Sequence, residues 1–174
     1  MKISLLTLLM LFAQPVLLAE VVHVDEHGFQ VTNTATVQQS PDQVWRALIN
    51  DVDQWWPKDH TWWRGALSIE ASAGGCFCEV ADDRSAQHMD IRFVDPSKRL
   101  IMTGGLGPLQ GMGMHGALDW TLTPIPSGTQ ITLSYSVVGI HPQGFTDLAP
   151  VVADVQALQL AGLSTYLSAK TTQD

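Results

Sequence analysis

The sequence predicts an α+β fold in which a long C-terminal helix lies against an antiparallel sheet. Two features indicate this class: a helical pattern over 147–169 and a succession of alternating segments before it. A helix with one apolar face, at the end of a chain rich in strands, buries that face against a sheet. Asp147 is the expected N-cap, and Pro150 is compatible with the first turn. The apolar face follows the i, i+3, i+4, i+7 spacing and consists of Leu148, Val151, Val152, Val155, Leu158, Leu163, Tyr166 and Leu167.

The first 19 residues, Met1–Ala19, are expected to be a signal peptide that is absent from the mature protein. Lys2 precedes a mostly apolar run, and a small residue precedes the expected cut. Gln14 and Pro15 interrupt the run before it reaches the roughly 18–20 residues that a membrane span needs. This disfavours the alternative, a retained anchor. We therefore expect a periplasmic or secreted protein with no stable membrane insertion.

The mature chain, 20–174, has 155 residues and is expected to form one domain with a sizeable core. It carries 8 Lys and Arg against 17 Asp and Glu, a net charge of −9. A chain with this charge has no basic stripe, so nucleic acid and anionic lipid surfaces are poor partners. The histidines are scattered and form no HExxH motif, so no metal and no cofactor are assigned.

The only two cysteines, Cys76 and Cys78, are two positions apart. On a regular strand their Cα atoms would be about 7 Å apart, which is beyond ordinary disulfide reach. We expect them to be small core residues, and a redox or metal site is the alternative.

The N-terminal part of the mature chain predicts a long strand and then a capped helix. The strand, 20–39, has one apolar face made of Phe29, Val31, Ala35 and Val37. Asn33 lies on that face and requires a bulge or a partner for its amide. Ser40 and Gln43 form the capping box of a short helix that ends near Asn50.

Five of the six tryptophans lie between Trp45 and Trp63, four of them as the pairs 55–56 and 62–63. Each ring buries a large apolar area and keeps one polar N–H group. Two interpretations remain open, a plug at one end of the core or the wall of a pocket.

The rest of the chain before the helix predicts a meander of six strands, at 66–70, 76–80, 87–94, 99–103, 116–123 and 130–138. The strand at 87–94 alternates buried Met89, Ile91 and Phe93 with exposed His88, Asp90 and Arg92. The last two strands point the side chains of Leu118, Trp120, Leu122, Ile131, Leu133, Tyr135 and Val137 inward.

A glycine-rich segment, GGLGPLQGMGMHG at 104–116, separates two of these strands. It lacks the lysine and the following helix of a phosphate-binding loop, so we expect a flexible hairpin loop. Met112 and Met114 adapt to varied apolar shapes and would suit a gate at the mouth of a cavity.

Five stretches resemble the START-like, helix-grip superfamily, also called the SRPBCC or polyketide-cyclase/lipid-transport group. They are SPDQVWRALIND, GGCFCEV, HMDIRFVDPSKRLIMTG, LDWTLTPIPSGTQITLSYSV and the terminal helix. The likeness spans roughly 31–167 and is greatest to the branch homologous to activators of heat-shock-protein ATPases. It implies one START-like domain over 20–174, with two short helices after the first strand and a curved antiparallel sheet wrapped around the C-terminal helix. It also implies a cavity between sheet and helix for lipids, sterols, polyketides or other apolar molecules.

We therefore expect a binding protein for a small apolar molecule. The Tyr135 hydroxyl would orient this molecule by one hydrogen bond, while apolar walls supply affinity. The expected ligand-binding residues are Trp55, Trp56, Trp63, Met89, Ile91, Phe93, Met112, Met114, Trp120, Leu133, Tyr135, Phe145, Leu148 and Val152.

Two other functions stay open. A cyclase- or hydrolase-type enzyme would use polar groups in the cavity, with Glu70, Glu79, His115 and Tyr135 as acid–base candidates. No GxSxG motif supports a nucleophile, so no catalytic residue is assigned and catalysis is disfavoured. A protein-interaction domain would instead show an exposed apolar patch near the tryptophans.

Overall fold

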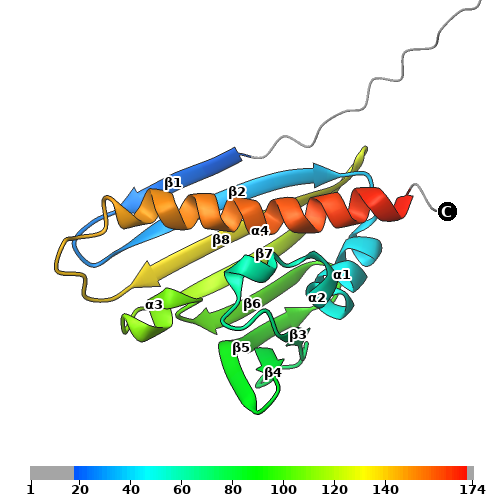
Figure 1. The fold of residues 1–174 in the computed structure, drawn as a ribbon. Helices are drawn as coiled ribbons and strands as arrows, with labels where there is room; N and C mark the ends of the chain where they lie inside the picture. Colours follow the sequence, from blue (N-terminus) through cyan, green and yellow to red (C-terminus); the bar gives the residue numbers. More distant parts are fainter. Residues whose placement is uncertain (1–17, 172–174) are drawn as a thin grey trace, which may run out of the picture.

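The computed structural model describes residues 18–171 and shows one antiparallel sheet of eight strands with a long helix along it (Figure 1). The strand order across the sheet is β1-β2-β8-β7-β6-β5-β4-β3. The strands are β1 (Leu18–Val24), β2 (Gly28–Val37), β3 (Ala66–Ile69), β4 (Cys76–Ala81), β5 (Arg84–Asp95), β6 (Arg99–Gly104), β7 (His115–Ile125) and β8 (Gly128–Val138). The helices are α1 (Pro41–Asn50), α2 (Val52–Trp55), the 3-10 turn η1 (Lys58–His60), α3 (Pro108–Gly111) and α4 (Leu148–Thr171).

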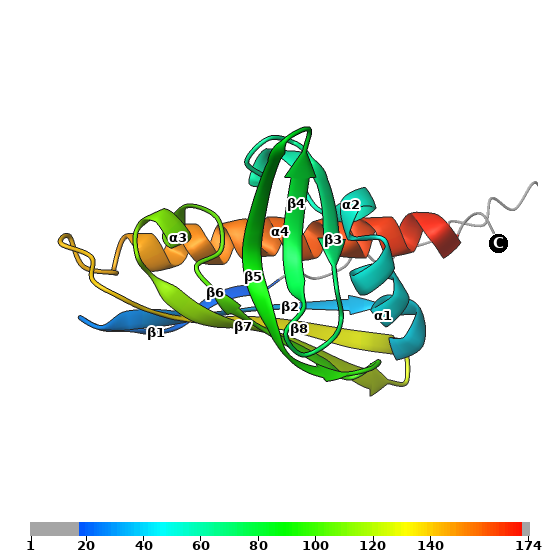
Figure 2. The ribbon, with the colours of Figure 1, turned by 90° about the horizontal axis from the view of Figure 1, so that it is seen from below.

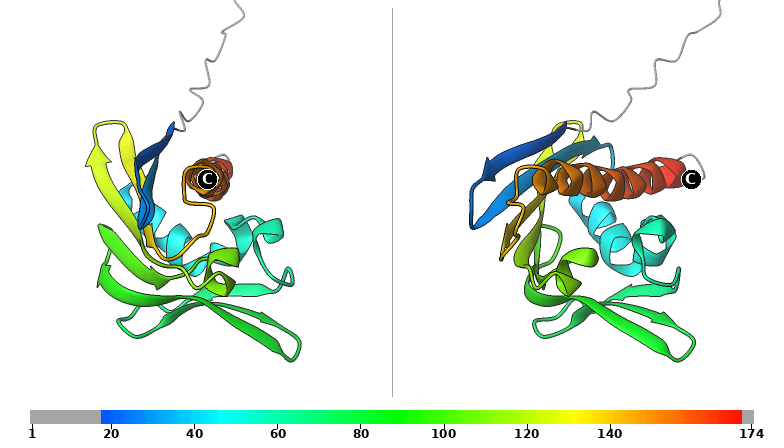
Figure 3. Two further views of the ribbon diagram at one scale, coloured as in Figure 1. Left: turned by 90° about the vertical axis from the view of Figure 1, so that its left-hand side faces the viewer. Right: turned by 60° about the vertical axis from the view of Figure 1, so that its left-hand side comes forward.

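The sheet is curved and partly encloses α4, which confirms the predicted fold class. Seen along α4, the sheet bends from β1 and β2 beside the helix to β3, β4 and β5 beneath it (Figure 3). β3, β4 and β5 run across the direction of α4 (Figure 2). The helix packs on β2 and β1, and near its C-terminal end also on α1 and α2. No helix in the described range 18–171 is long and apolar enough to cross a membrane.

The predicted long first strand is wrong, because it is two strands joined by a turn. The Asp25 Oδ1 atom accepts hydrogen bonds from the backbone N–H groups of His27 (2.8 Å) and Gly28 (3.1 Å), which reverses the chain. The buried face predicted for this region is confirmed on β2. Asn33 lies on that face in regular register with β8, and both polar atoms of its amide lack a partner within the described part of the chain. The predicted signal peptide lies outside the described residues except for 18 and 19, which begin β1.

The capping box at the start of α1 is confirmed. The Ser40 Oγ atom accepts a hydrogen bond from the Gln43 N–H group (3.4 Å), and the Ser40 N–H group donates to Gln43 Oε1 (2.9 Å). The side chains of Val44, Ala47 and Leu48 are buried beneath the helix. Local sequence signals are sufficient here because each bond joins residues within one turn.

The alternation predicted along β5 is wrong at both ends of the segment. His88 is 4% exposed and Phe93 is 44% exposed, the reverse of the expectation. The pairing of β5 with β4 shifts by one residue beside His88, and its pairing with β6 shifts beside Arg92. Each bulge moves the following side chains to the opposite face of the sheet.

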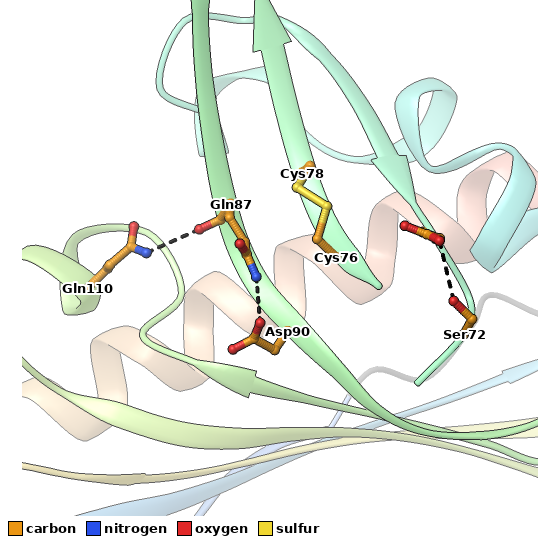
Figure 4. The surroundings of a disulfide bond; sticks show 7 residues. Ser72, Cys76, Cys78, Gln87, Asp90 and Gln110 are labelled. Carbon is orange, nitrogen blue, oxygen red and sulfur yellow. Dashed lines mark hydrogen bonds between the residues drawn. A yellow bond between two sulfur atoms is a disulfide. The ribbon is translucent and has the colours of Figure 1, made fainter. Parts of the chain in front are cut away.

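The interpretation of Cys76 and Cys78 as unlinked core residues is also wrong, because they form a disulfide (Figure 4). Their Cα atoms are 5.5 Å apart, closer than the roughly 7 Å of a regular strand. The chain bends at Phe77, next to the register shift between β4 and β5. Both cysteines alternate with buried Phe77, so they lie half-buried on the outer face, beside Gln87 and Asp90 of β5 (Figure 4).

The extent of α4 is close to the prediction, and its buried face is partly as predicted, since Val152, Leu163 and Leu167 are buried. Val151 and Leu158, assigned to the apolar face, are each 57% exposed. Gln156 and Gln159 are each 2% exposed. The buried positions are Ala149, Val152, Ala153, Gln156, Gln159, Leu160, Leu163, Ser164 and Leu167. Because α4 carries apolar residues around most of its circumference, spacing alone does not determine which side faces the sheet.

Candidate ligand-binding site

A cavity of about 420 Å³ lies beside the first half of α4. It is bordered by four parts of the chain: α4, the 59–62 segment that overlaps η1, the 106–112 segment that contains α3, and the inner faces of β5 and β8. The lining residues are Asp59, His60, Thr61, Trp62, His88, Leu106, Gly107, Pro108, Leu109, Met112, Tyr135, Leu148, Val151, Val152, Val155, Gln156 and Gln159. Most of these residues contribute apolar surface.

Four of the predicted ligand-binding residues line this cavity: Met112, Tyr135, Leu148 and Val152. Eight others are buried in the core outside the lining: Trp55, Trp56, Met89, Ile91, Met114, Trp120, Leu133 and Phe145. The last two are on the surface: the guanidinium of Arg84 lies 5.5 Å from the ring of half-buried Trp63, and that of Arg99 lies 5.9 Å from exposed Phe93.

The glycine-rich segment, expected to be a flexible hairpin loop, joins the paired strands β6 and β7 and contains the short helix α3. The Leu106–Met112 part covers the cavity, with Met112 partly exposed and Met114 buried behind it. The Gln110 side chain donates a hydrogen bond to the Gln87 carbonyl oxygen (3.1 Å), which ties α3 to β5 (Figure 4). The α3 segment therefore forms an ordered wall of the cavity.

Tyr135 holds this wall in place. Its hydroxyl donates to the Gly104 carbonyl oxygen (2.9 Å) and accepts from the Leu106 N–H group (3.0 Å). Burial raises the pKa of Tyr135 to about 12, so the hydroxyl keeps its proton at neutral pH. Because the hydroxyl proton is donated to Gly104, it is not free to bond to a ligand. Tyr135 therefore positions the backbone of residues 104–106.

Two glutamines form a polar strip on the α4 wall, and sequence reasoning missed both. Gln156 and Gln159 are three positions apart, so their side chains lie on one face of the helix. The Oε1 atom of each is buried and has no hydrogen-bond partner within residues 18–171. The Nδ1 atom of His60, on the opposing segment, is buried and unpartnered in the same described range. Buried polar atoms are usually paired, so such a group beside a cavity indicates a place for a ligand or water.

His88 reaches the cavity because of the bulge in β5. Its Nε2 atom lies 3.2 Å from Glu79 Oε2, and its ring packs 5.0 Å from the ring of Phe77. Burial lowers the pKa of His88 and outweighs the opposing effect of the Glu79 carboxylate, so the imidazole is neutral at pH 7. The alternation of the 87–94 strand predicts an exposed His88, so the sequence did not indicate that this residue lines the cavity.

Glu79 anchors the segment that carries Trp62. Its carboxylate accepts hydrogen bonds from the backbone N–H groups of Trp62 (2.8 Å), Trp63 (2.9 Å) and Gly65 (2.9 Å). Burial raises the pKa of Glu79, but these three hydrogen bonds outweigh burial and hold it below the ordinary value. Of the predicted acid–base candidates, Glu79 and Tyr135 are buried, whereas Glu70 and His115 are exposed.

Comparison with known proteins places the chain in a family. The sequence profile of the family described as Activator of Hsp90 ATPase homolog 1-like protein matches residues 38–152. Among curated proteins none matches the sequence.

Solved structures share the fold at low sequence identity. Protein MLL2253 from Mesorhizobium loti is 19% identical with a TM-score of 0.61, over 82% of this chain and 98% of that one. An uncharacterised protein from Rhizobium leguminosarum is 16% identical with a TM-score of 0.62, over 88% and 98%. CalU16 from Micromonospora echinospora is 15% identical with a TM-score of 0.57, over 92% and 88%.

The SRPBCC, helix-grip fold that the sequence resembles is therefore confirmed, and this fold supports a ligand-binding or cyclase-like domain. The profile match covers well over half of the chain, from the residue after β2 into α4. The chain belongs to the family of Activator of Hsp90 ATPase homolog 1-like proteins.

Proposed function

We propose that the protein is exported and binds a small, largely apolar molecule in the cavity between α4 and the sheet. The observation that carries this proposal is the cavity itself, which combines apolar walls with a few polar groups that have no partner in the described part of the protein. Small-molecule sites typically have this composition, with volumes of about 300–1,000 Å³. The family fold supports the same function.

Native mass spectrometry of protein purified from its own host tests this proposal. We expect a bound mass, which organic extraction releases for identification. A Val155→Trp variant fills the cavity and should lose that mass, whereas Leu158→Trp, on the exposed side of α4, should retain it. If both variants retained the molecule equally, its binding site would lie outside this cavity.

Export is tested by the N-terminus of the mature protein. A signal peptide of 19 residues predicts that the protein in the periplasm or medium begins at Glu20. Intact protein that begins at Met1 and remains in the cytoplasm would contradict export and leave the binding proposal unaffected.

A second candidate function, a cyclase- or hydrolase-type reaction, is favoured by one observation. His88 lines the cavity as a neutral imidazole and is paired with the Glu79 carboxylate, which is the arrangement of a general base with an orienting partner. The extracted molecule should then be converted by wild-type protein and not by His88→Phe: hydrolysis adds the mass of one water, and cyclisation without loss of water changes the chromatographic retention at constant mass. An unchanged mass and an unchanged retention with both proteins would support binding alone.

A further inference from the structure

The polar strip on α4 determines which chemical groups of a ligand the cavity can bind. Gln156 and Gln159 are buried, line the cavity and each have an Oε1 atom without a partner in the described residues. An amide side chain offers both an acceptor oxygen and two N–H donors. A group that both donates and accepts, such as a hydroxyl, therefore complements each glutamine.

The charges around the cavity set a second requirement. No lysine or arginine is among the lining residues. Lys58, in the adjoining segment, is bonded to the Asp53 carboxylate and to the Gly65 carbonyl oxygen. The other ionisable side chains of the lining are the carboxylate of Asp59 at the rim and the imidazoles of His60 and His88, of which that of His88 is neutral at pH 7. A buried anion would face no lysine or arginine here, and burying an unpaired charge is strongly unfavourable.

We infer that the ligand is an uncharged molecule with an apolar body and a hydroxyl or amide group that bonds to Gln156 and Gln159. Carboxylate ligands of the fatty-acid type should bind more weakly, because no lysine or arginine lines this cavity. The inference rests on the proposed function and narrows it to one chemical class. It assigns the anchoring role to the two glutamines in place of Tyr135, whose proton is used by Gly104.

Three probes of matched shape test the inference at pH 7: naphthalene, 2-naphthol and 2-naphthoate. They carry no polar group, an uncharged hydroxyl and a carboxylate, respectively. By equilibrium dialysis we expect 2-naphthol to bind about 5–10-fold more tightly than naphthalene, the effect of one or two hydrogen bonds. We expect 2-naphthoate to bind at least about 10-fold more weakly than 2-naphthol.

The double variant Gln156→Leu/Gln159→Leu identifies the residues responsible. It should bind naphthalene at least as tightly as the wild type and lose the preference for 2-naphthol. Gln54→Leu, on an exposed position of α2, is the matched control and should keep that preference.

The outcomes separate this inference from the function on which it rests. Equal affinity for all three probes, tighter binding of 2-naphthoate, or an unchanged 2-naphthol preference in the double variant would overturn the inference and leave cavity binding intact. If none of the probes binds the wild type, both the inference and the proposed function are contradicted. The thermal unfolding midpoint of each variant should lie well above the dialysis temperature, which confirms that folded proteins are being compared.

Discussion

The two halves of α4 differ in what they contact. In the C-terminal half, Leu160, Leu163 and Leu167 are almost fully buried. A second hollow of about 480 Å³ lies at the end of this half, between Leu167 and Lys170 of α4 and the largely polar side chains of α1. At Gly162 the helix approaches α2 so closely that a Cβ atom would lie 2.4 Å from the Trp55 carbonyl oxygen. The N-terminal half, from Leu148 to Gln159, borders the cavity instead and buries two glutamines there.

The sheet shows the same division. β2, β8 and β7 pair in unbroken register, and α4 packs on β2 and on its neighbour β1. β4, β5 and β6 contain two register shifts and the disulfide, and they bring His88 to the cavity and Phe93 to the surface. β1 also shifts register against β2, between Val21 and His23, but the shifts beside His88 and Arg92 are the ones that change which side chains of β5 face the cavity.

The largest expected effect is on the closely packed half of α4. Leu163→Ala should lower the free energy of unfolding by about 2–5 kcal/mol, because it leaves a cavity in a fully buried position. The matched change Leu158→Ala removes an exposed side chain of the same helix and should stay within about 0.5 kcal/mol. Urea denaturation measures both, and similar losses would mean that the burial pattern of α4 is wrong.

A smaller effect is expected at the anchor of the cavity wall. Glu79→Gln should lower the free energy of unfolding by about 2–3 kcal/mol, because an amide replaces the carboxylate that accepts three backbone hydrogen bonds. Hydrogen exchange at the Trp62 and Trp63 amides should accelerate in this variant. Exchange rates equal to those of the wild type would contradict the anchoring role.

The same residue gives a pH dependence. The pKa of Glu79 is lower in the fold than its ordinary value of 4.5, so the unfolded chain takes up this proton first. The stabilisation is therefore complete above about pH 4.5 and is lost as the pH falls towards the pKa of the folded state. His88 acts in the same direction, because burial lowers its pKa from 6.5. Glu79→Gln should flatten the stability profile below about pH 4.5, and a profile parallel to that of the wild type would contradict this.

Removal of the disulfide should have a modest effect. Cys76 and Cys78 are two positions apart, and closing so short a loop constrains the unfolded chain by only about 1.5 kcal/mol. The double variant Cys76→Ser/Cys78→Ser should lose about that much stability in thermal unfolding. A loss above about 4 kcal/mol would show that the bend at Phe77 depends on the bond, a larger effect than loop closure explains.

The smallest effect has the opposite sign. Gln159→Leu should raise the free energy of unfolding by about 1 kcal/mol, because it removes a buried acceptor that has no partner in the described protein. Gln54→Leu on the surface should change stability by less than about 0.5 kcal/mol. A loss of stability in Gln159→Leu would mean that its amide supports the fold, and the contrast between the two halves of α4 would then disappear.

Sequence reasoning identified part of the cavity lining. It named Tyr135, Leu148, Val152 and Met112, because each lies on an element whose position follows from the order of strands and helices. It missed Gln156, Gln159 and His88, since polar residues are expected outside and their burial depends on the helix rotation and on a bulge. The role of Tyr135 also changed, because its hydroxyl meets the backbone of a segment 29 to 31 positions away.

The sequence by itself determined the α+β class, the strand–helix–meander–helix order, the start of α1 and the inward faces of β7 and β8. These features depend on local signals, namely capping, turns and period-two alternation, which act within a few residues. Only the tertiary structure decided the rotation of α4, the pairing of Cys76 with Cys78 and the inward turn of His88. Those outcomes depend on how one element pairs with or packs against another, and in a strand a shift of one residue exchanges the buried and exposed faces.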